Sequence, residues 1–295
     1  MTVFSFSRAF AALLLAAAAL AVALAAPAGA TAPAPSLNYV ALGDSYTAGP
    51  FIPNQIAVDT PPGCAQSDHN YPHLLASLTS HVSLTDVSCS GAVTDDMTQP
   101  QVTAVGTNSP QFDALTKKTL VVTVGIGGND IGFSSILGSC ATATPTGHPC
   151  QDAYVVNGVD TLQQRIDATA PKIAAVIQGI HQRSPLAKVM VVGYPDILPT
   201  SGPGCFPQMP FAPDDIPYLN GVEVHLDQML AAEARANRAD YVNTYIATIG
   251  HDACQSPSNR WIEPVVPASP AAPVHPNAKG EQAMAAATLI RFLLP

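Results

Sequence analysis

Short apolar runs alternate along the chain with longer segments in which apolar residues recur at helical spacing. The short runs predict five strands, at residues 37–42, 82–87, 119–125, 188–192 and 241–243, of which the third is largely β-branched. The longer segments predict helices over residues 71–80, 159–182, 218–238 and 277–292, the second of them kinked at Pro171. Strands that alternate with helices form a parallel sheet covered on both faces. We therefore predict an α/β fold in which a five-stranded parallel sheet lies between two layers of helices.

The first thirty residues have the pattern of a secretory signal peptide. Arg8 is the only charged residue there, an uninterrupted apolar run covers residues 9–26, and Ala28-Gly29-Ala30 fits the small-residue cleavage site. We predict a signal peptide over residues 1–30 and a single secreted, extracellular domain over residues 31–295. Because the apolar run is long, a retained membrane anchor is the alternative. No later segment is long and apolar enough to span a bilayer, so we expect no stable membrane anchor.

The chain is acidic, with 12 basic and 21 acidic residues and a formal net charge of -9. Without basic clusters, such a chain is a poor partner for nucleic acids or anionic membranes. Two glycine clusters do not fit a phosphate loop, because residues 43–49 contain no lysine and Asp130 would repel a phosphate next to Gly127 and Gly128. We therefore expect the protein to bind no nucleic acid. We also expect it to be a monomer.

Six cysteines in an exported chain are most simply three disulfides, for which fifteen connectivities are possible. No spacing typical of a zinc site occurs, so we expect no metal. Pairing each cysteine with its neighbour along the chain closes three separate loops. This pairing is our expectation: Cys64–Cys89, Cys140–Cys150 and Cys205–Cys254.

The first predicted strand runs into the turn Gly43-Asp44-Ser45. A serine at a strand-to-helix turn holds its hydroxyl exposed above the edge of the sheet, where a nucleophile is useful. The alternative is a plain capped turn, since Asp and Ser both form local hydrogen bonds there. For Asp44 itself, stabilisation of the turn is the better hypothesis, because its position next to Ser45 aims its side chain elsewhere.

Three further residues are expected at the same edge of the sheet. Gly91 and Asn129 each follow a predicted strand, and His275 precedes the last predicted helix. The carboxyl ends of parallel strands share one edge, and ligands bind in the crevice there. Ester hydrolysis through a serine needs a nucleophile, a base and donors for the developing oxyanion. Ser45 and His275 would supply the first two, and the N–H groups of Ser45 and Gly91 with the Asn129 amide would supply the donors.

These residues together resemble the motif blocks of the SGNH (GDSL-type) hydrolase family. Gly43-Asp44-Ser45 is similar to the first block, Gly91 to the second, residues 127–130 to the third and His275-Pro276-Asn277 to the fifth. With the six cysteines and the segment 260–264, the chain looks most like the secreted actinomycete lipases and esterases of that family. The resemblance implies a flavodoxin-like three-layer α/β/α fold and the hydrolysis of carboxylic esters without a cofactor.

The resemblance leaves the substrate open. The leading hypothesis is a secreted lipase or esterase that acts through an acyl-enzyme on Ser45. The alternative enzyme is a phospholipase or a carbohydrate acetyl-esterase of the same fold. The alternative that is not an enzyme is an inactive binding module. The loop 193–217 is apolar enough to line an acyl groove, but it could equally be a surface loop pinned by a disulfide.

Two positions depart from the family pattern. Tyr46 stands where the family has Leu, a change that we expect to be harmless, and Ala272 stands where the family has an Asp three residues before the histidine. A base histidine needs an acceptor at Nδ1, and a backbone carbonyl can serve. The neighbouring prolines restrain this segment, so we predict that the Ala272 carbonyl orients His275. The rival is a carboxylate from the preceding loop, either Glu263 or Asp252.

Overall fold

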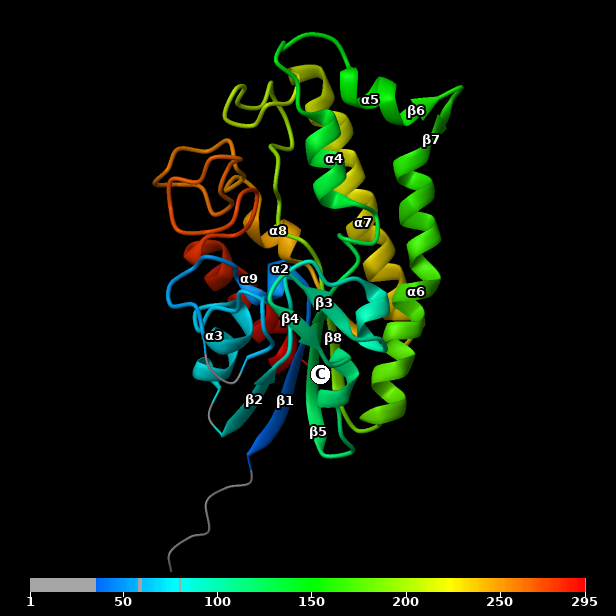
Figure 1. Cartoon of the computed structure of the whole chain (residues 1–295), viewed down its shortest axis with the longest axis vertical. Coiled ribbons are helices and arrows are strands. Elements are labelled where there is room, and N and C mark those ends of the chain that lie inside the picture. The colour runs from blue at the N-terminus through cyan, green and yellow to red at the C-terminus, as the bar shows by residue number, and fades with distance from the viewer. Residues whose placement is uncertain (1–35, 58–59, 80, 295) are drawn as a thin grey trace, which may run out of the picture. The chain divides into compact units, whose positions relative to one another are not determined.

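Five parallel strands form the central sheet of the computed structural model, which describes residues 36–57, 60–79 and 81–294 (Figure 1). The predicted signal peptide lies outside these residues. The strand order is β2–β1–β5–β8–β9, and every neighbouring pair is parallel. The bounds are β1 Leu37–Gly43, β2 Val82–Asp86, β5 Thr119–Gly125, β8 Lys188–Val192 and β9 Asp240–Val242. The predicted fold class and all five strands are therefore confirmed.

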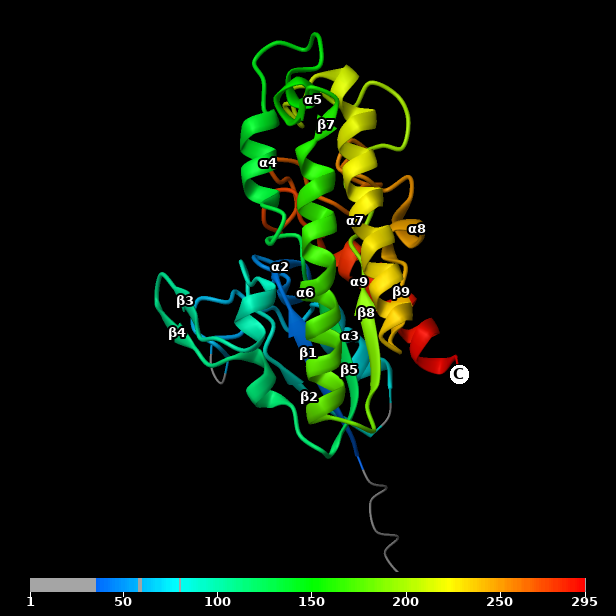
Figure 2. The same ribbon diagram turned by 90° about the vertical axis from the view of Figure 1, so that its right-hand side faces the viewer.

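Helices cover both faces of the sheet. The helices α6 (Thr161–Arg183) and α7 (Ile216–Ala236) pack together on one face, whereas α3 (Tyr71–Leu78) and α9 (Ala278–Leu293) pack together on the other (Figures 1 and 2). Alternate residues of a strand point to opposite faces. Accordingly Val40 and Leu42 of β1 join the core beneath α6 and α7, while Tyr39 and Ala41 join the core beneath α3 and α9.

The long helix α6 differs at its start from the predicted one. It begins at Thr161, because residues 155–160 form a hairpin of β6 (Val155–Val156) and β7 (Val159–Asp160). Asn157 and Gly158 make the tight turn, both with positive φ. Asp160 then caps α6 by accepting hydrogen bonds from the first turn. The helix continues through Pro171 to Arg183.

Shorter elements connect the layers. They are α2 (Ser45–Ala48), α4 (Phe133–Cys140), α5 (Pro149–Tyr154), α8 (Thr244–Thr248), the hairpin of β3 (Gln101–Thr103) and β4 (Gly106–Asn108), and three short 3₁₀ helices, Thr94–Met97, Gln111–Ala114 and Pro213–Asp215. Three disulfides pin the connecting loops, with the neighbour pairing that we expected: Cys64–Cys89, Cys140–Cys150 and Cys205–Cys254. Of the helices that the structure describes, none has the length and apolar character needed to cross a bilayer.

Candidate active site

Ser45 is the first residue of α2, directly after the carboxyl end of β1. The chain enters this turn through Gly43, whose φ is +152°, and a Cβ there would lie 2.3 Å from Thr47 Oγ1. The Gln111 side chain fixes Gly43 from the side, accepting from its N–H at 2.8 Å and donating to its carbonyl at 2.9 Å. At the first position of a helix the backbone N–H has no intrahelical partner. Ser45 therefore presents both its hydroxyl and its N–H at the edge of the sheet.

Asp44 stabilises this turn rather than acting on the histidine. Its Oδ1 accepts from the Tyr46 N–H at 2.9 Å, which caps α2, and its Oδ2 accepts from the Tyr194 hydroxyl at 2.5 Å. Burial raises the pKa of Asp44 to about 7, although these hydrogen bonds act in the opposite direction. The Tyr194 hydroxyl also accepts from the Gly128 N–H at 2.7 Å. Tyr194 thus ties the serine turn to the loop after β5.

His275 meets Ser45 at this edge. Its Nε2 lies 2.7 Å from Ser45 Oγ, and its Nδ1 donates to the carbonyl of Pro273 at 2.8 Å. Burial lowers the pKa of His275, and the hydrogen bond to Pro273 works against this shift. A carbonyl at Nδ1 fixes the tautomer in which Nε2 can accept the proton of the serine.

The carbonyl at Nδ1 comes from Pro273 and not from Ala272, so that prediction was wrong by one residue. Val274 has a positive φ of 60°, which turns the chain so that the Pro273 carbonyl reaches the imidazole. The Ala272 carbonyl instead accepts from the backbone N–H of His275 at 3.2 Å.

The two rival carboxylates are engaged elsewhere. Glu263 is fully buried and accepts from Arg260 at 3.0 Å, from the Asn277 amide at 2.8 Å and from two backbone N–H groups of its own loop. Burial acts to raise the pKa of Glu263, but these bonds outweigh it and lower the pKa. Asp252 accepts from the Cys254 N–H and the Gln255 side chain. Among the described residues, no carboxylate forms a hydrogen bond with His275 Nδ1.

Tyr46 holds the histidine from a third side. Its ring stacks on the imidazole of His275 with centroids 4.6 Å apart, and its hydroxyl donates to the Val274 carbonyl at 2.6 Å. Tyr46, which replaces the family Leu, therefore contacts the histidine segment directly. Sequence reasoning missed this role, although the departure itself marked the position.

The three predicted oxyanion donors share the same edge. The loop after β2 is tied to the end of β1, where the Cys89 N–H donates to the Gly43 carbonyl at 2.9 Å. Gly91 follows in this loop with φ +79°, and an added Cβ there would meet no atom within 4 Å. The Asn129 amide donates one hydrogen bond to the Ala92 carbonyl at 2.9 Å, which leaves its second N–H for another acceptor. The loops after β1, β2 and β5 thus form one connected surface.

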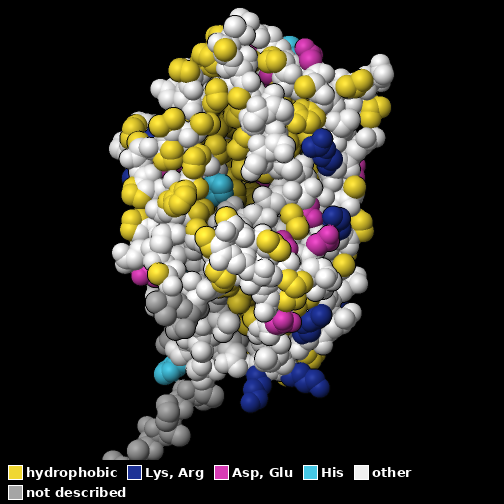
Figure 3. Space-filling view, in the orientation of Figure 1, with side chains coloured by type: hydrophobic (Ala, Val, Ile, Leu, Met, Phe, Trp, Pro, Cys, Tyr) yellow, Lys and Arg dark blue, Asp and Glu magenta, His cyan; other side chains and the backbone are white. Residues whose placement is uncertain are grey.

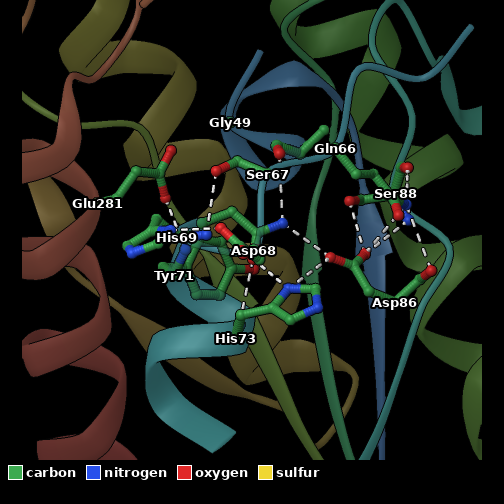
Figure 4. Close-up of polar contacts among 12 residues, drawn as sticks. Gly49, Gln66, Ser67, Asp68, His69, Tyr71, His73, Asp86, Ser88 and Glu281 are labelled. Carbon is green, nitrogen blue, oxygen red and sulfur yellow. Dashed lines mark hydrogen bonds and ion pairs between the residues drawn. The ribbon is translucent and has the colours of Figure 1, made fainter. Parts of the chain in front are cut away.

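A polar network braces the loop that leads to Gly91 (Figure 4). The buried carboxylate of Asp86, at the end of β2, accepts from the Ser88 hydroxyl at 2.7 Å, from the Ser88 N–H at 2.9 Å and from Asn70 at 2.8 Å. His73 lies 3.6 Å from the same carboxylate. Asn70 also donates to the Ala48 carbonyl at the end of α2. The Asp86 network therefore supports the loop after β2 and the end of α2.

An apolar pocket of about 60 Å³ opens next to Tyr46. It is lined by Tyr46, Ile131, Phe133, Ile136, Leu137, Tyr194, Ile197, Leu198, Leu219, Val222, Glu223 and Leu226. Of the apolar residues in the loop 193–217, Ile197 and Leu198 line it, whereas Met209, Phe211 and Ile216 are buried in the core. Figure 3 shows hydrophobic side chains gathered around a hollow in this region, between α2, α4 and α8 of Figure 1.

Comparison with known proteins decides the family. A sequence model of the GDSL-like lipase/acylhydrolase family matches residues 41–283. Lipase 2 of Streptomyces coelicolor is 39% identical over 264 residues, which cover 86% of this chain and 85% of the relative. The chain belongs to the GDSL-like lipase/acylhydrolase family. It is a lipase or esterase, and the resemblance drawn from its motif blocks is confirmed.

Two solved structures of Streptomyces enzymes have this fold. The extracellular lipase of Streptomyces rimosus superposes with a TM-score of 0.72 at 23% identity, and phospholipase A1 of Streptomyces albidoflavus with a TM-score of 0.71 at 24% identity. Each comparison covers 88% of this chain and 100% of the other. At this identity the likeness shows that the lipase/acylhydrolase chain shares their fold.

Two other histidines of this lipase/acylhydrolase contact neighbouring side chains. His225 pairs with Asp167, and the ring of His251 stacks on Trp261 with centroids 3.5 Å apart. Among the described residues, no group of three or more His, Cys, Asp or Glu side chains is arranged to hold a metal ion. Tyr194 is the polar residue that sequence reasoning missed at the site, although its place just beyond a predicted strand was a usable signal.

Proposed function

We propose that the protein is a secreted serine esterase or lipase in which Ser45 is the nucleophile and His275 the general base. The observation that carries the proposal is the contact of 2.7 Å between Ser45 Oγ and His275 Nε2. In this geometry the imidazole takes the hydroxyl proton while Oγ attacks the ester carbonyl. The histidine then returns the proton to the departing alcohol, and water hydrolyses the acyl-enzyme by the same route.

The developing oxyanion needs donors that are already in place. The N–H groups of Ser45 and Gly91 and the free N–H of the Asn129 amide are the donors available at this edge of the sheet. Removing one such donor costs about 10²–10³ in kcat. Asn129→Ala should therefore lower kcat far more than it changes KM, and a change in KM alone would make Asn129 a binding residue.

Replacing the nucleophile tests the assignment directly. Ser45→Ala should leave a folded, disulfide-bonded protein whose turnover of p-nitrophenyl butyrate falls by about 10³ or more. A fluorophosphonate should label the parent protein at Ser45 and leave the variant unlabelled. Activity close to that of the parent in Ser45→Ala would overturn the proposed function.

We further propose that the apolar pocket next to Tyr46 receives the acyl chain. Apart from Glu223, its walls are aliphatic and aromatic, and it begins at the residue that follows the nucleophile. A panel of acetyl, butyryl and octanoyl esters should show a preference for the longer chains. Ile136→Trp, which fills the pocket, should shift the preference towards acetyl. A parent profile that already favours acetyl would support the sugar deacetylase alternative.

Export is proposed from two features. The N-terminal segment has the pattern of a signal peptide, and the chain has three disulfides, which persist in oxidising compartments. Expression in an actinomycete host should deliver the mature protein to the medium. Its N-terminus, read by peptide sequencing, should begin at Thr31.

A further inference from the structure

Four segments that surround the active site contain no Asp, Glu, Lys or Arg. These are residues 45–57 with the serine, 131–151 and 197–213 with much of the apolar pocket, and 264–278 with the histidine. In the whole chain 11% of residues are charged. Figure 3 agrees, because the charged side chains on that face lie mainly away from the hollow. The rim of the site is thus depleted of charge, whereas the protein as a whole carries a net charge of -9.

Three large hydrophobic side chains are exposed on this rim. Phe51 is 62% exposed, Val266 is 79% exposed and Val265 is 37% exposed. Two backbone hydrogen bonds place them beside the histidine segment. The Ala272 N–H donates to the carbonyl of Pro50 at 3.0 Å, and the Val274 N–H donates to the carbonyl of Pro264 at 3.4 Å. We call Phe51, Val265 and Val266 the rim patch.

Two features of Phe51 cost free energy in the folded protein. It exposes an aromatic ring to water, and its backbone has φ +67°, in the left-handed region that is uncommon for a bulky side chain. Neither core packing nor the turn after Gly49 requires an aromatic residue there. Strained and exposed residues of this kind are concentrated at sites where a protein binds something.

We propose that the rim patch docks the enzyme on a lipid surface without net charge, so that the ester enters the site from that surface. The inference extends the proposed function and rests on it. Apolar side chains that enter the boundary between headgroups and acyl chains gain the free energy of leaving water. A zwitterionic or neutral surface matches a rim that lacks charged residues. An anionic surface would repel the acidic protein.

Binding can be measured separately from hydrolysis. Ser45→Ala protein is mixed with phosphatidylcholine vesicles, and the bound fraction is determined by sedimentation. Each fully buried Phe or Val side chain is worth a factor of about ten or more in an equilibrium constant. Phe51→Ser combined with Val266→Ser should therefore weaken the partitioning by at least about tenfold. The matched control is Leu186→Ser, whose side chain is 74% exposed just before β8, at the opposite edge of the sheet. It should bind as the parent does.

The same pair of substitutions is then tested in the active enzyme. Hydrolysis of an emulsified triglyceride should fall by about tenfold, while turnover of soluble p-nitrophenyl butyrate stays within twofold of the parent. Thermal unfolding confirms that each variant is folded. Loss of soluble turnover in Ser45→Ala tests the proposed function independently, so a failure of docking and a failure of catalysis give different results.

Three outcomes would overturn the docking proposal. They are unchanged partitioning of the double variant, an equal loss of binding in Leu186→Ser, and tighter binding when a third of the phosphatidylcholine is replaced by phosphatidylserine. The last result would mean that charge, and not the rim patch, drives the contact.

Discussion

The ring of Tyr46 lies against the imidazole of His275, with centroids 4.6 Å apart and an angle of 29° between the planes. The hydroxyl of the same tyrosine donates to the carbonyl of Val274 at 2.6 Å. Because Tyr46 directly follows Ser45 in α2, one short helix sets the position of the serine and also that of the histidine segment. The chain has Ala272 where the family has an aspartate. The histidine is held instead by Tyr46 and by the Pro273 carbonyl.

Substitution of Tyr46 separates its two contacts. Tyr46→Phe keeps the stacked ring but leaves the Val274 carbonyl without its donor, and the loss of one buried hydrogen bond is worth about 1–1.5 kcal/mol. We expect kcat for a soluble ester to fall about tenfold, with KM nearly unchanged. Tyr46→Leu also removes the stack and should lose more. The rate at which a fluorophosphonate labels Ser45 should fall in parallel with kcat.

A buried tyrosine on the other face of the sheet provides the control. The Tyr39 hydroxyl is hydrogen-bonded to Thr123 at 2.8 Å, away from the histidine. Tyr39→Phe should lower the unfolding temperature about as much as Tyr46→Phe but leave kcat unchanged. Equal losses of kcat in the two variants would show that the effect of Tyr46 is general destabilisation.

A second prediction tests whether the Pro273 carbonyl or a carboxylate is the partner of His275 Nδ1. Glu263 neutralises the buried Arg260, so Glu263→Gln should destabilise the fold by about 3 kcal/mol, as expected when a buried ion pair is broken. The kcat of the folded protein, measured well below the unfolding temperature, should change by less than about tenfold. Asp252→Asn should behave similarly, whereas His275→Ala should lose about 10³ or more. A loss of that size in either amide variant would mean that a carboxylate acts on the histidine.

The position of the sheet and of the site residues could be predicted because each depends on local pattern. Apolar β-branched runs define the strands, and the residues just beyond them meet at one edge whatever the details of the loops. The hairpin before α6 was not predicted, although Asn157-Gly158 is a strong turn signal, because strands of two residues are too short to show an alternating pattern.

The partner of His275 could not be predicted from local pattern. A β-branched residue such as Val274 is unfavourable at positive φ, so the sequence favours an extended segment with Ala272 near the imidazole. The native turn is stabilised by the hydroxyl of Tyr46, which is 228 positions away in the sequence. A tertiary contact thus overrides the local preference and moves the acceptor to Pro273.

A third prediction concerns the pH dependence of the reaction. Burial lowers the pKa of His275 from its ordinary value of 6.5, so the imidazole loses its proton below that pH. Because the base must be neutral, kcat/KM for a soluble ester should rise with pH, reach half its maximum below pH 6.5 and stay high at alkaline pH. The buried Asp44, with a pKa of about 7, can add a second inflection. Asp44→Asn should remove that inflection and keep the lower one. A single inflection above pH 7 that survives in Asp44→Asn would contradict a desolvated histidine.

The last prediction concerns stability. Burial raises the pKa of Asp227, on α7, to about 7, although its Oδ1 accepts from the Tyr194 N–H at 2.9 Å. The unfolded chain releases this proton near the ordinary value of 3.8, so between about pH 4 and pH 7 the folded state binds more protons than the unfolded state. Its contribution to the free energy of unfolding therefore falls as pH rises through that window, by at most about 1.4 kcal/mol per pH unit.

Asp227→Asn removes this titration and keeps an acceptor for Tyr194. Urea unfolding of both proteins from pH 4.5 to pH 8 should show that the parent loses stability with rising pH relative to the variant. The difference between their slopes reports Asp227 together with its effect on Glu223, a buried neighbour whose pKa the charge of Asp227 raises. Parallel curves for the two proteins across this range would mean that Asp227 is ionised in the folded state and that its environment compensates for burial.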